Sequence, residues 1–161
     1  MMIMTAKVNM KKILIVLGAI AALLIGIIAL SGSTETTTTS ATASDNDSRV
    51  SFLKSFGWEV TTSPVESGQV RIPTETTEVY DRYNQLQQTQ GYDLTQYAGK
   101  KVMRYVYKVT NFPGATDPVY ATVLVHKNQI IGGDVTNTTA GGKIQSFKMN
   151  GSIMETAPSS T

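Results

Sequence analysis

The chain opens with a long apolar run that stands apart from everything after it. Residues 13–30 are eighteen positions of apolar side chains and glycine without a single charge. As a helix they would measure about 27 Å, close to the ~30 Å hydrocarbon core of a bilayer. Lys11 and Lys12 precede the run and no Lys or Arg follows it before Arg49. The positive-inside bias therefore predicts a transmembrane anchor at 13–30, with residues 1–12 in the cytoplasm and the remainder outside.

A cleaved signal peptide is the alternative interpretation of this run. Signal peptides also join a basic start to an apolar stretch, but that stretch usually has about 7–15 residues. Ala29-Leu30-Ser31 matches the small-residue cleavage rule only in part. The length favours an anchor in the cell membrane, whereas cleavage near Ser31 would give a secreted domain. Met10, which is followed by two lysines, is an alternative translation start.

Two segments lack the apolar residues that a core requires. Residues 31–47 are Ser, Thr, Ala, Gly, Asn and acids, a composition that predicts a disordered linker. Residues 155–161 form a polar end that we expect to be a flexible tail. Between them, residues 48–154 have the length of one domain with its own core.

Helical spacing dominates the first half of that domain. Residues 48–56 place Val50, Leu53 and Phe56 along one face, with Gly57 as the stop. Residues 58–60 and 69–72 predict two short strands that form a hairpin.

A longer helix is predicted after this hairpin. Thr74 can cap it, and Val79, Tyr83 and Leu86 share its buried face. Gly91 ends the helix, and residues 93–97 predict one further turn.

Alternation replaces helical spacing from residue 101 onward. In residues 101–110, Met103, Tyr105 and Tyr107 point one way, while Arg104 and Lys108 point the other. Further strands are predicted at 119–126, 129–135 and 143–149.

The third strand contains Gly132-Gly133, which predicts a bulge or the close approach of another backbone. Helices followed by consecutive strands predict an α+β fold, in which two N-terminal helices cover one face of an antiparallel β-meander.

Several boxes of residues, in order along the chain, resemble an uncharacterised family of Gram-positive bacteria known as domain of unknown function DUF4830. The resemblance is carried by Arg49-Val50 with Phe52-Leu53, Gly57-Trp58-Glu59-Val60, Val79-Tyr80 with Tyr83-Asn84 and Leu86-Gln87, Gly99-Lys100-Lys101-Val102 with Arg104-Tyr105, and Ile130-Ile131-Gly132-Gly133-Asp134-Val135. It covers essentially all of the predicted exported domain and implies a membrane-anchored or secreted architecture. It implies no activity, so no catalytic residue is carried over.

Composition excludes several kinds of chemistry. The chain has no cysteine and a single histidine, His126, so it cannot build a zinc site from Cys and His, a disulfide or a lipidated cysteine. It contains no P-loop, no G-x-G-x-x-G and no G-x-S-x-G. From residue 48 onward there are 11 basic and 9 acidic residues, a net charge of +2, which indicates no nucleic-acid partner. We therefore expect no cofactor and no metal.

Carboxylates leave one enzymatic alternative open, a hydrolase acting on cell-wall glycans with a pair of acids. Most of the acids lie beside turns or caps, where solvation and capping explain them. Asp134 is the exception, because it follows the double glycine. The available acids are Glu59, Glu66, Asp93, Asp117 and Asp134.

A binding surface is the leading functional prediction. Five residues form the predicted outer face of the sheet: Arg104, Lys108, Tyr120, Thr122 and His126. Such a basic and aromatic face suits an acidic peptide, a wall polymer or a partner protein, although a plain solvated sheet face has the same pattern. With Asp134 added as a candidate contact, the sequence predicts a non-catalytic binding or sensory module at the cell surface.

Overall fold

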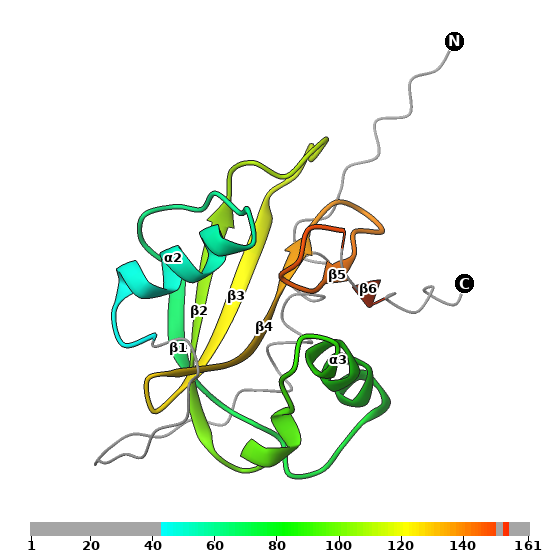
Figure 1. Ribbon diagram of the computed structural model, residues 1–161. Helices are drawn as coiled ribbons and strands as arrows, with labels where there is room; N and C mark the ends of the chain where they lie inside the picture. The colour runs from blue at the N-terminus through cyan, green and yellow to red at the C-terminus, as the bar shows by residue number, and fades with distance from the viewer. Residues whose placement is uncertain (1–42, 151–152, 155–161) are drawn as a thin grey trace.

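An antiparallel sheet with a helix on each face forms the molecule (Figure 1). The computed structural model describes residues 43–150 and the backbone of residues 153–154. Six strands lie in the sheet in sequence order: β1 (Glu66–Arg71), β2 (Lys101–Val109), β3 (Val119–His126), β4 (Gln129–Asn137), β5 (Ile144–Gln145) and β6 (Ile153–Met154). The helical elements are α2 (Asn46–Ser55), α3 (Glu78–Gln88) and the 3-10 helix η1 (Leu94–Tyr97). The predicted α+β class and the antiparallel strands are confirmed.

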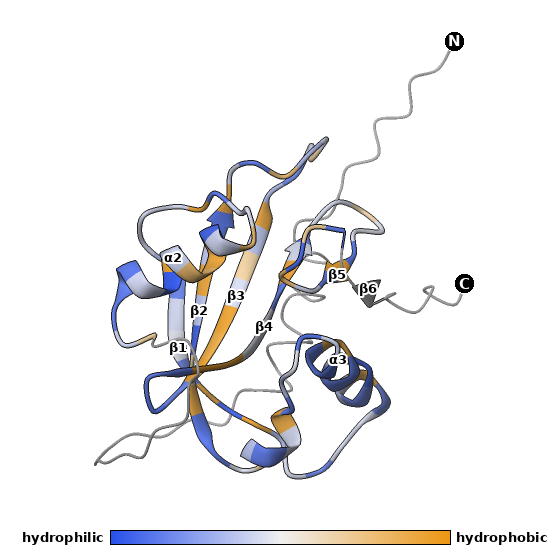
Figure 2. Cartoon of the chain, in the orientation of Figure 1, coloured by the Kyte–Doolittle hydropathy of each residue, from blue (hydrophilic) through white to orange (hydrophobic). Residues whose placement is uncertain are grey.

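The two helices cover opposite faces of the sheet. Leu124 of β3 packs in a core cluster with Leu86 of α3, and its neighbour Val123 packs with Leu53 of α2. Successive residues of a strand point to opposite faces, so these two clusters define an α3 face and an α2 face. The prediction that both helices cover one face is therefore wrong. Figure 2 shows the physical reason, because β3 is hydrophobic along most of its length and needs cover on both sides.

Helix α2 begins two residues earlier than predicted. Its N-cap is Asp45, whose Oδ1 accepts a hydrogen bond of 2.7 Å from the Ser48 N–H, and this bond lowers the pKa of the Asp45 carboxyl. Gly57 follows the helix with φ of 91°, as expected for a glycine stop. Residues 43–47, which we had placed in the linker, belong to the folded part, because Ala43 is buried and donates to the Asn128 carbonyl at 2.8 Å.

Arg49 fastens this first segment to the sheet. Its guanidinium donates to the Ala43 carbonyl at 2.8 Å and to the Tyr107 hydroxyl at 3.0 Å. It also lies 3.7 Å from the centroid of the Tyr105 ring, a favourable cation–π distance. The buried guanidinium is thus held by a carbonyl oxygen, a hydroxyl and an aromatic ring.

The predicted hairpin of residues 58–60 and 69–72 is wrong. Val60 forms an isolated bridge with Val109, and β1 pairs with β2 from Glu66 to Arg71. Both segments therefore line the same edge of β2, whose nine residues are long enough to accept them in succession.

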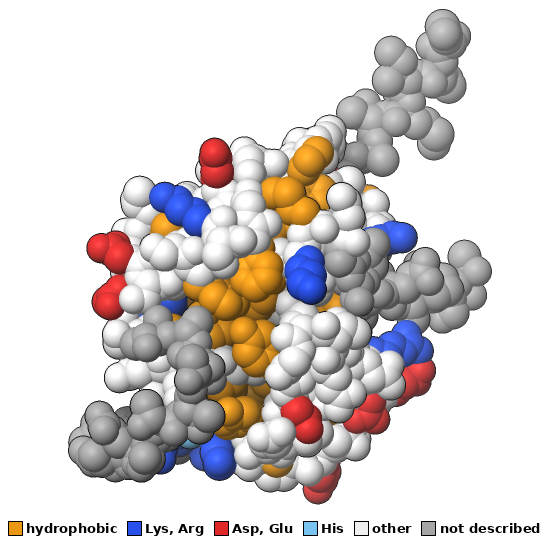
Figure 3. Space-filling view, viewed as in Figure 1, with side chains coloured by type: hydrophobic (Ala, Val, Ile, Leu, Met, Phe, Trp, Pro, Cys, Tyr) orange, Lys and Arg blue, Asp and Glu red, His pale blue; other side chains and the backbone are white. Residues whose placement is uncertain are grey.

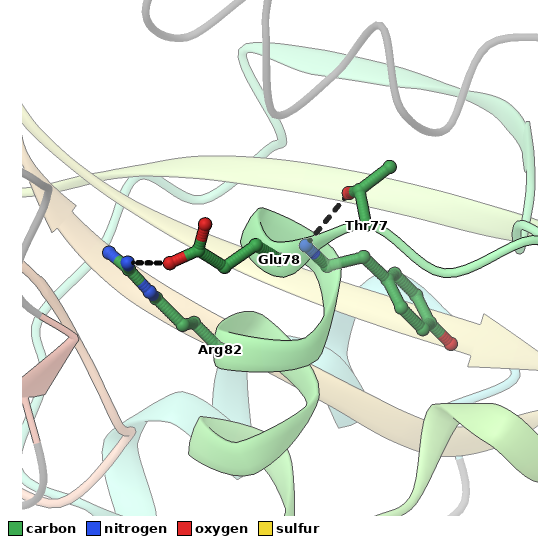
Figure 4. A network of polar contacts seen from close by, with 4 residues as sticks. Thr77, Glu78 and Arg82 are labelled. Atoms are coloured by element: carbon green, nitrogen blue, oxygen red, sulfur yellow. Dashed lines mark hydrogen bonds and ion pairs between the residues drawn. The ribbon is translucent and has the colours of Figure 1, made fainter.

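Helix α3 begins at a capping residue and an ion pair (Figure 4). Thr77 is the N-cap, and its hydroxyl accepts a hydrogen bond of 3.2 Å from the Tyr80 N–H. Glu78 forms an ion pair with Arg82 one turn later. An acid in the first turn also suits the positive end of the helix dipole.

This start lies three residues beyond the predicted cap, Thr74, and the buried face differs as well. Tyr83 and Leu86 are buried as predicted, but Val79 is 45% exposed and Tyr80 is buried instead. Residues three or four apart share a helix face, and the face that holds Tyr80 and Tyr83 turns Val79 toward solvent.

A bulge lies directly beside the double glycine of β4. Leu124 pairs with Gly132 whereas Val125 pairs with Ile130, so Ile131 is the extra residue. A Cβ on Gly133 would lie 2.0 Å from the Thr122 carbonyl oxygen, a distance that no side chain tolerates.

Two glutamines approach this bulge, Gln87 from α3 and Gln90 from the turn after it. Gln87 Oε1 accepts from the Gly133 N–H at 2.8 Å. The Gln90 amide donates to the Gly133 carbonyl at 3.0 Å and accepts from the Phe147 N–H at 2.8 Å. The side chains thereby bond to backbone groups of β4 outside its pairing with β5, which covers only Val135 and Thr136.

The C-terminal strand is shorter than predicted. Within 143–149 only β5 has strand pairing, and Phe147 turns into the α2-face core. Four predicted segments lie outside the described residues: the cytoplasmic segment 1–12, the anchor at 13–30, the linker up to residue 42 and the tail at 155–161. Among the residues that are described, no helix has the length and apolarity to cross a membrane.

Candidate functional site

Five of the predicted site residues share the α3 face but do not form one cluster: Arg104, Lys108, Tyr120, His126 and Asp134. Lys108 lies opposite Tyr120, and Thr122 lies opposite Asp134 in the ladders, which places these side chains on one face. Helix α3 packs over part of that face. The residues therefore occupy three different environments along β2, β3 and β4: Arg104 with Asp134, Lys108 with Tyr120, and His126 alone.

Asp134 is buried beneath α3. Its Oδ1 accepts from the Tyr83 hydroxyl at 2.8 Å and its Oδ2 from the Thr136 hydroxyl at 2.6 Å. Burial raises the pKa of Asp134, while the bonds from Thr136 and Tyr83 and the positive charge of Arg104 act in the opposite direction. Burial and the neighbouring carboxylate also raise the pKa of Tyr83 well above its ordinary value. This carboxylate joins a helix to a strand.

Arg104 pairs with Glu66 on the edge strand β1. The Arg104 side chain is 14% exposed and that of Glu66 is 62% exposed. The positive charge is thus already matched by an acid of the same chain, and a partly exposed pair of this kind contributes only about 0–1 kcal/mol.

Lys108, Tyr120 and Thr136 form a line across three strands, which we call the Lys108 row. Lys108 is directly opposite Tyr120, and Tyr120 is directly opposite Thr136. Lys108 is exposed and the other two are half-buried, and directly opposite side chains have Cβ atoms about 4.5–5.5 Å apart. An ammonium and two hydroxyl groups therefore share a solvent-accessible strip on a hydrogen-bonded scaffold.

His126 lies at the far end of β3 from this row. Its ring contacts Tyr97 at 5.4 Å between centroids, and its Nδ1 is 3.3 Å from the Lys101 carbonyl oxygen. Burial lowers the pKa of His126, and the charges of Lys100 and Lys127 act in the same direction. This imidazole, packed at the end of η1, is not part of the Lys108 row.

The other carboxylates do not gather into a metal or acid cluster. Among the described residues there is no group of three His, Asp or Glu side chains that could hold a metal ion. Asp93 caps η1 and accepts from the Thr95 N–H and the Asn84 amide, each at 3.0 Å. The Thr95 hydroxyl, which donates to Asp93 at 2.7 Å, lowers the pKa of Asp93, and the bonds from Asn84 and the Thr95 N–H act in the same direction.

Thr136 and Tyr83 are site residues that the sequence did not identify as such, and Glu66 was named only as a candidate acid and not as the partner of Arg104. Thr136 could have been found, because it lies two residues after Asp134 on the same strand face. The pairing of Tyr83 with Asp134 joins residues 51 positions apart, and no local pattern predicts it.

The α2 face has a different character. Figure 3 shows hydrophobic side chains at the surface in a band between the part that carries α2 and the part that carries α3. Half-buried apolar residues pack on the α2-face core, among them Phe52, Phe56, Tyr105 and Phe112. The two faces therefore offer different chemistry, polar and basic on one side and aromatic on the other.

The family model described as Domain of unknown function (DUF4830) matches residues 52–135. The chain belongs to the DUF4830 family. The match runs from within α2 to β4, so the DUF4830 region contains all five predicted site residues and the glycine bulge, while Thr136 lies one residue beyond it. No curated protein and no solved structure shows significant similarity to the chain. For this DUF4830 member, function has to be argued from its own residues.

Proposed function

We propose that this DUF4830 chain is a non-catalytic binding module that residues 13–30 hold at the outer surface of a membrane, and that it contacts an acidic partner through the Lys108 row. The observation that carries the proposal is the row itself: Lys108, Tyr120 and Thr136 lie directly opposite one another on three paired strands. A sheet fixes such groups more firmly than a loop does. The partner would be a protein or a wall polymer with carboxylate or phosphate groups.

Asp134 supports a non-catalytic role. A general acid or base must come within hydrogen-bond reach of its substrate, whereas this carboxylate is buried and already bonded to Tyr83 and Thr136. No observation in the described part of the chain favours the alternative of a wall hydrolase.

The membrane part of the proposal rests on the apolar run and the lysines before it. Twelve residues, 31–42, connect that run to Ala43. Fully extended they would reach about 40 Å, enough to present either face of the domain to a partner near the bilayer.

Site-specific photo-crosslinking of the full chain tests this function in cells that naturally produce it. A photoreactive residue at Tyr120 should give a discrete adduct, and the same residue at Glu75, which is exposed before α3, should not. The adduct should disappear when Lys108→Glu reverses the charge of the row. It should persist with Lys54→Glu, a matched reversal on α2.

Identical adducts from both positions, or an adduct that is indifferent to Lys108→Glu, would contradict the proposed surface. Absence of any adduct at Tyr120 would count equally against it.

A further inference from the structure

A pocket of about 250 Å³ lies between the β2–β3 and β4–β5 connections. Its lining includes Phe112, Asn137, Lys143 and Gln145. Gln145 pairs with Val135, a residue of the α2-face core, so the pocket and the Lys108 row are on opposite faces. Pockets for drug-sized ligands span about 300–1,000 Å³, and this smaller one suits a single ring.

The loop that forms one wall is held in shape by its own hydrogen bonds. Asn137 Oδ1 accepts from the Thr139 N–H at 2.9 Å and from the Thr139 hydroxyl at 2.7 Å. The Gly142 N–H donates to the Thr139 carbonyl at 2.6 Å. A Cβ on Gly142 would lie 2.0 Å from the Asn137 carbonyl oxygen, so only glycine allows the loop to close. Such a wall needs little ordering when a ligand binds.

Phe112 provides a fixed apolar wall. Its ring is parallel to that of Trp58 within 5°, with centroids 5.8 Å apart, and Trp58 is only 2% exposed. The preceding residue, Asn111, accepts from the Glu59 N–H at 2.9 Å and donates to the Gly57 carbonyl at 2.8 Å. Phe112 is thus backed by a buried ring and held by its neighbour, and it remains half-buried beside the pocket.

The polar groups of the lining are mainly donors. Because Asn137 Oδ1 is occupied by Thr139, its Nδ2 remains to donate. The Gln145 side chain is half-buried and forms no hydrogen bond with any described residue. Lys143 is exposed, and the lining contains no acid that would neutralise its ammonium.

We propose that this pocket binds one sugar ring that carries a carboxylate. The carboxylate would pair with Lys143, ring hydroxyls would meet the Asn137 and Gln145 amides, and the apolar face of the ring would pack on Phe112. A small carboxylic acid uses none of the aromatic wall, and a neutral sugar leaves the ammonium unpaired. The site is independent of the Lys108 row, and residues 137–145 lie beyond the DUF4830 match.

Ligand-observed NMR titration of the full chain in detergent micelles tests the proposal with glucuronate, glucose and acetate as probes. Glucuronate should bind about tenfold more tightly than glucose, which corresponds to one charge-assisted hydrogen bond. It should also bind more tightly than acetate, because acetate has no ring to pack on Phe112. Lys143→Met should reduce the affinity for glucuronate to that for glucose. Ala140→Trp, on an exposed lining residue, should fill the pocket and abolish binding of both sugars.

Lys54→Met on α2 is the matched control and should leave glucuronate affinity unchanged. Glucuronate binding that survives both pocket variants would overturn the site. Equal affinities for glucuronate and acetate would contradict the proposal that the ligand is a sugar. Equal affinities for glucuronate and glucose would contradict the proposal that it is acidic. The Lys143→Met result keeps the test decisive if Ala140→Trp alters the melting temperature.

Discussion

At the residue scale, Asp134 is a carboxylate whose direct neighbours are hydroxyl groups. Tyr83 and Thr136 donate to it from a helix and a strand, while the nearby cation, Arg104, is paired with Glu66. The hydrogen bonds stabilise the charged form, but the loss of solvation on burial has the larger effect and raises the pKa of Asp134. Asp134, the candidate acid after the two glycines, therefore links α3 to β4 through hydrogen bonds.

This environment predicts a pH dependence of stability for Asp134→Asn. Because the pKa of Asp134 is higher in the folded state than in the unfolded chain, the folded state binds the proton more tightly. The free energy of unfolding of the wild type should therefore fall, relative to the variant, as pH rises from about 4 through the raised pKa. Urea unfolding of both proteins from about pH 4 to about pH 7 measures the difference.

Asp117→Asn, which changes an exposed acid before β3, is the control and should follow the wild-type curve. A difference between wild type and Asp134→Asn that stays constant with pH would contradict the prediction.

At the element scale, α3 is held to β4 at the point where the strand has no side chains. Gln87 and Gln90 bond to the backbone of Gly133, and Gly132 leaves the space that Gln87 occupies, since a Cβ there would lie 2.8 Å from its Oε1. Helix, bulge and the Phe147 segment therefore form one packed unit.

A matched pair of glycine substitutions tests this arrangement. Gly133→Ala places a Cβ 2.0 Å from the Thr122 carbonyl oxygen at a φ of 152°, and we expect a loss of about 3 kcal/mol or more from overpacking and strain. Gly68→Ala in β1 meets nothing within 4 Å and should change stability by no more than about 0.5 kcal/mol.

Chemical denaturation of the two variants under identical conditions gives both values. Similar effects at the two positions would show that Gly133 is not held by the close approach of β3.

At the scale of the whole molecule, the polar α3 face and the aromatic α2 face belong to one small domain. Ala43, the first residue that the structure describes, is held there by a hydrogen bond from Arg49. The segment before Ala43 therefore joins a fixed point on the domain.

Membrane attachment through residues 13–30 is the prediction at this scale. The full chain should sediment with membranes and resist alkaline extraction, and protease added to intact cells should digest the domain. Deletion of residues 13–30 should leave the domain in the cytoplasm, because the export signal is lost.

Mass spectrometry of the mature chain separates the anchor from the alternative. An intact N-terminus beginning at Met1 or Met10 agrees with an anchor. A chain in the medium that begins near Ser31 would establish cleavage instead.

Local chemistry sufficed for much of the fold. Strand β2 was predicted within one residue because its side chains alternate with a period of two. Strands β3 and β4 lie within two residues of their predicted ranges. Gly57 ends a helix as predicted, since only a positive φ fits there. Lys108 and Tyr120 were placed on the same face by that period alone.

Contacts between distant residues decided the rest. Which face each helix covers depends on packing of whole surfaces, so the opposite placement of α2 and α3 could not be read from either helix. β1 joined β2 rather than residues 58–60 because pairing partners are chosen among all available edges. Asp134 is covered by α3 and bonded to Tyr83, a residue 51 positions away in the sequence. The sequence determined the elements through spacing and turn chemistry, and the tertiary structure decided their partners, because burial and pairing arise only when separate surfaces meet.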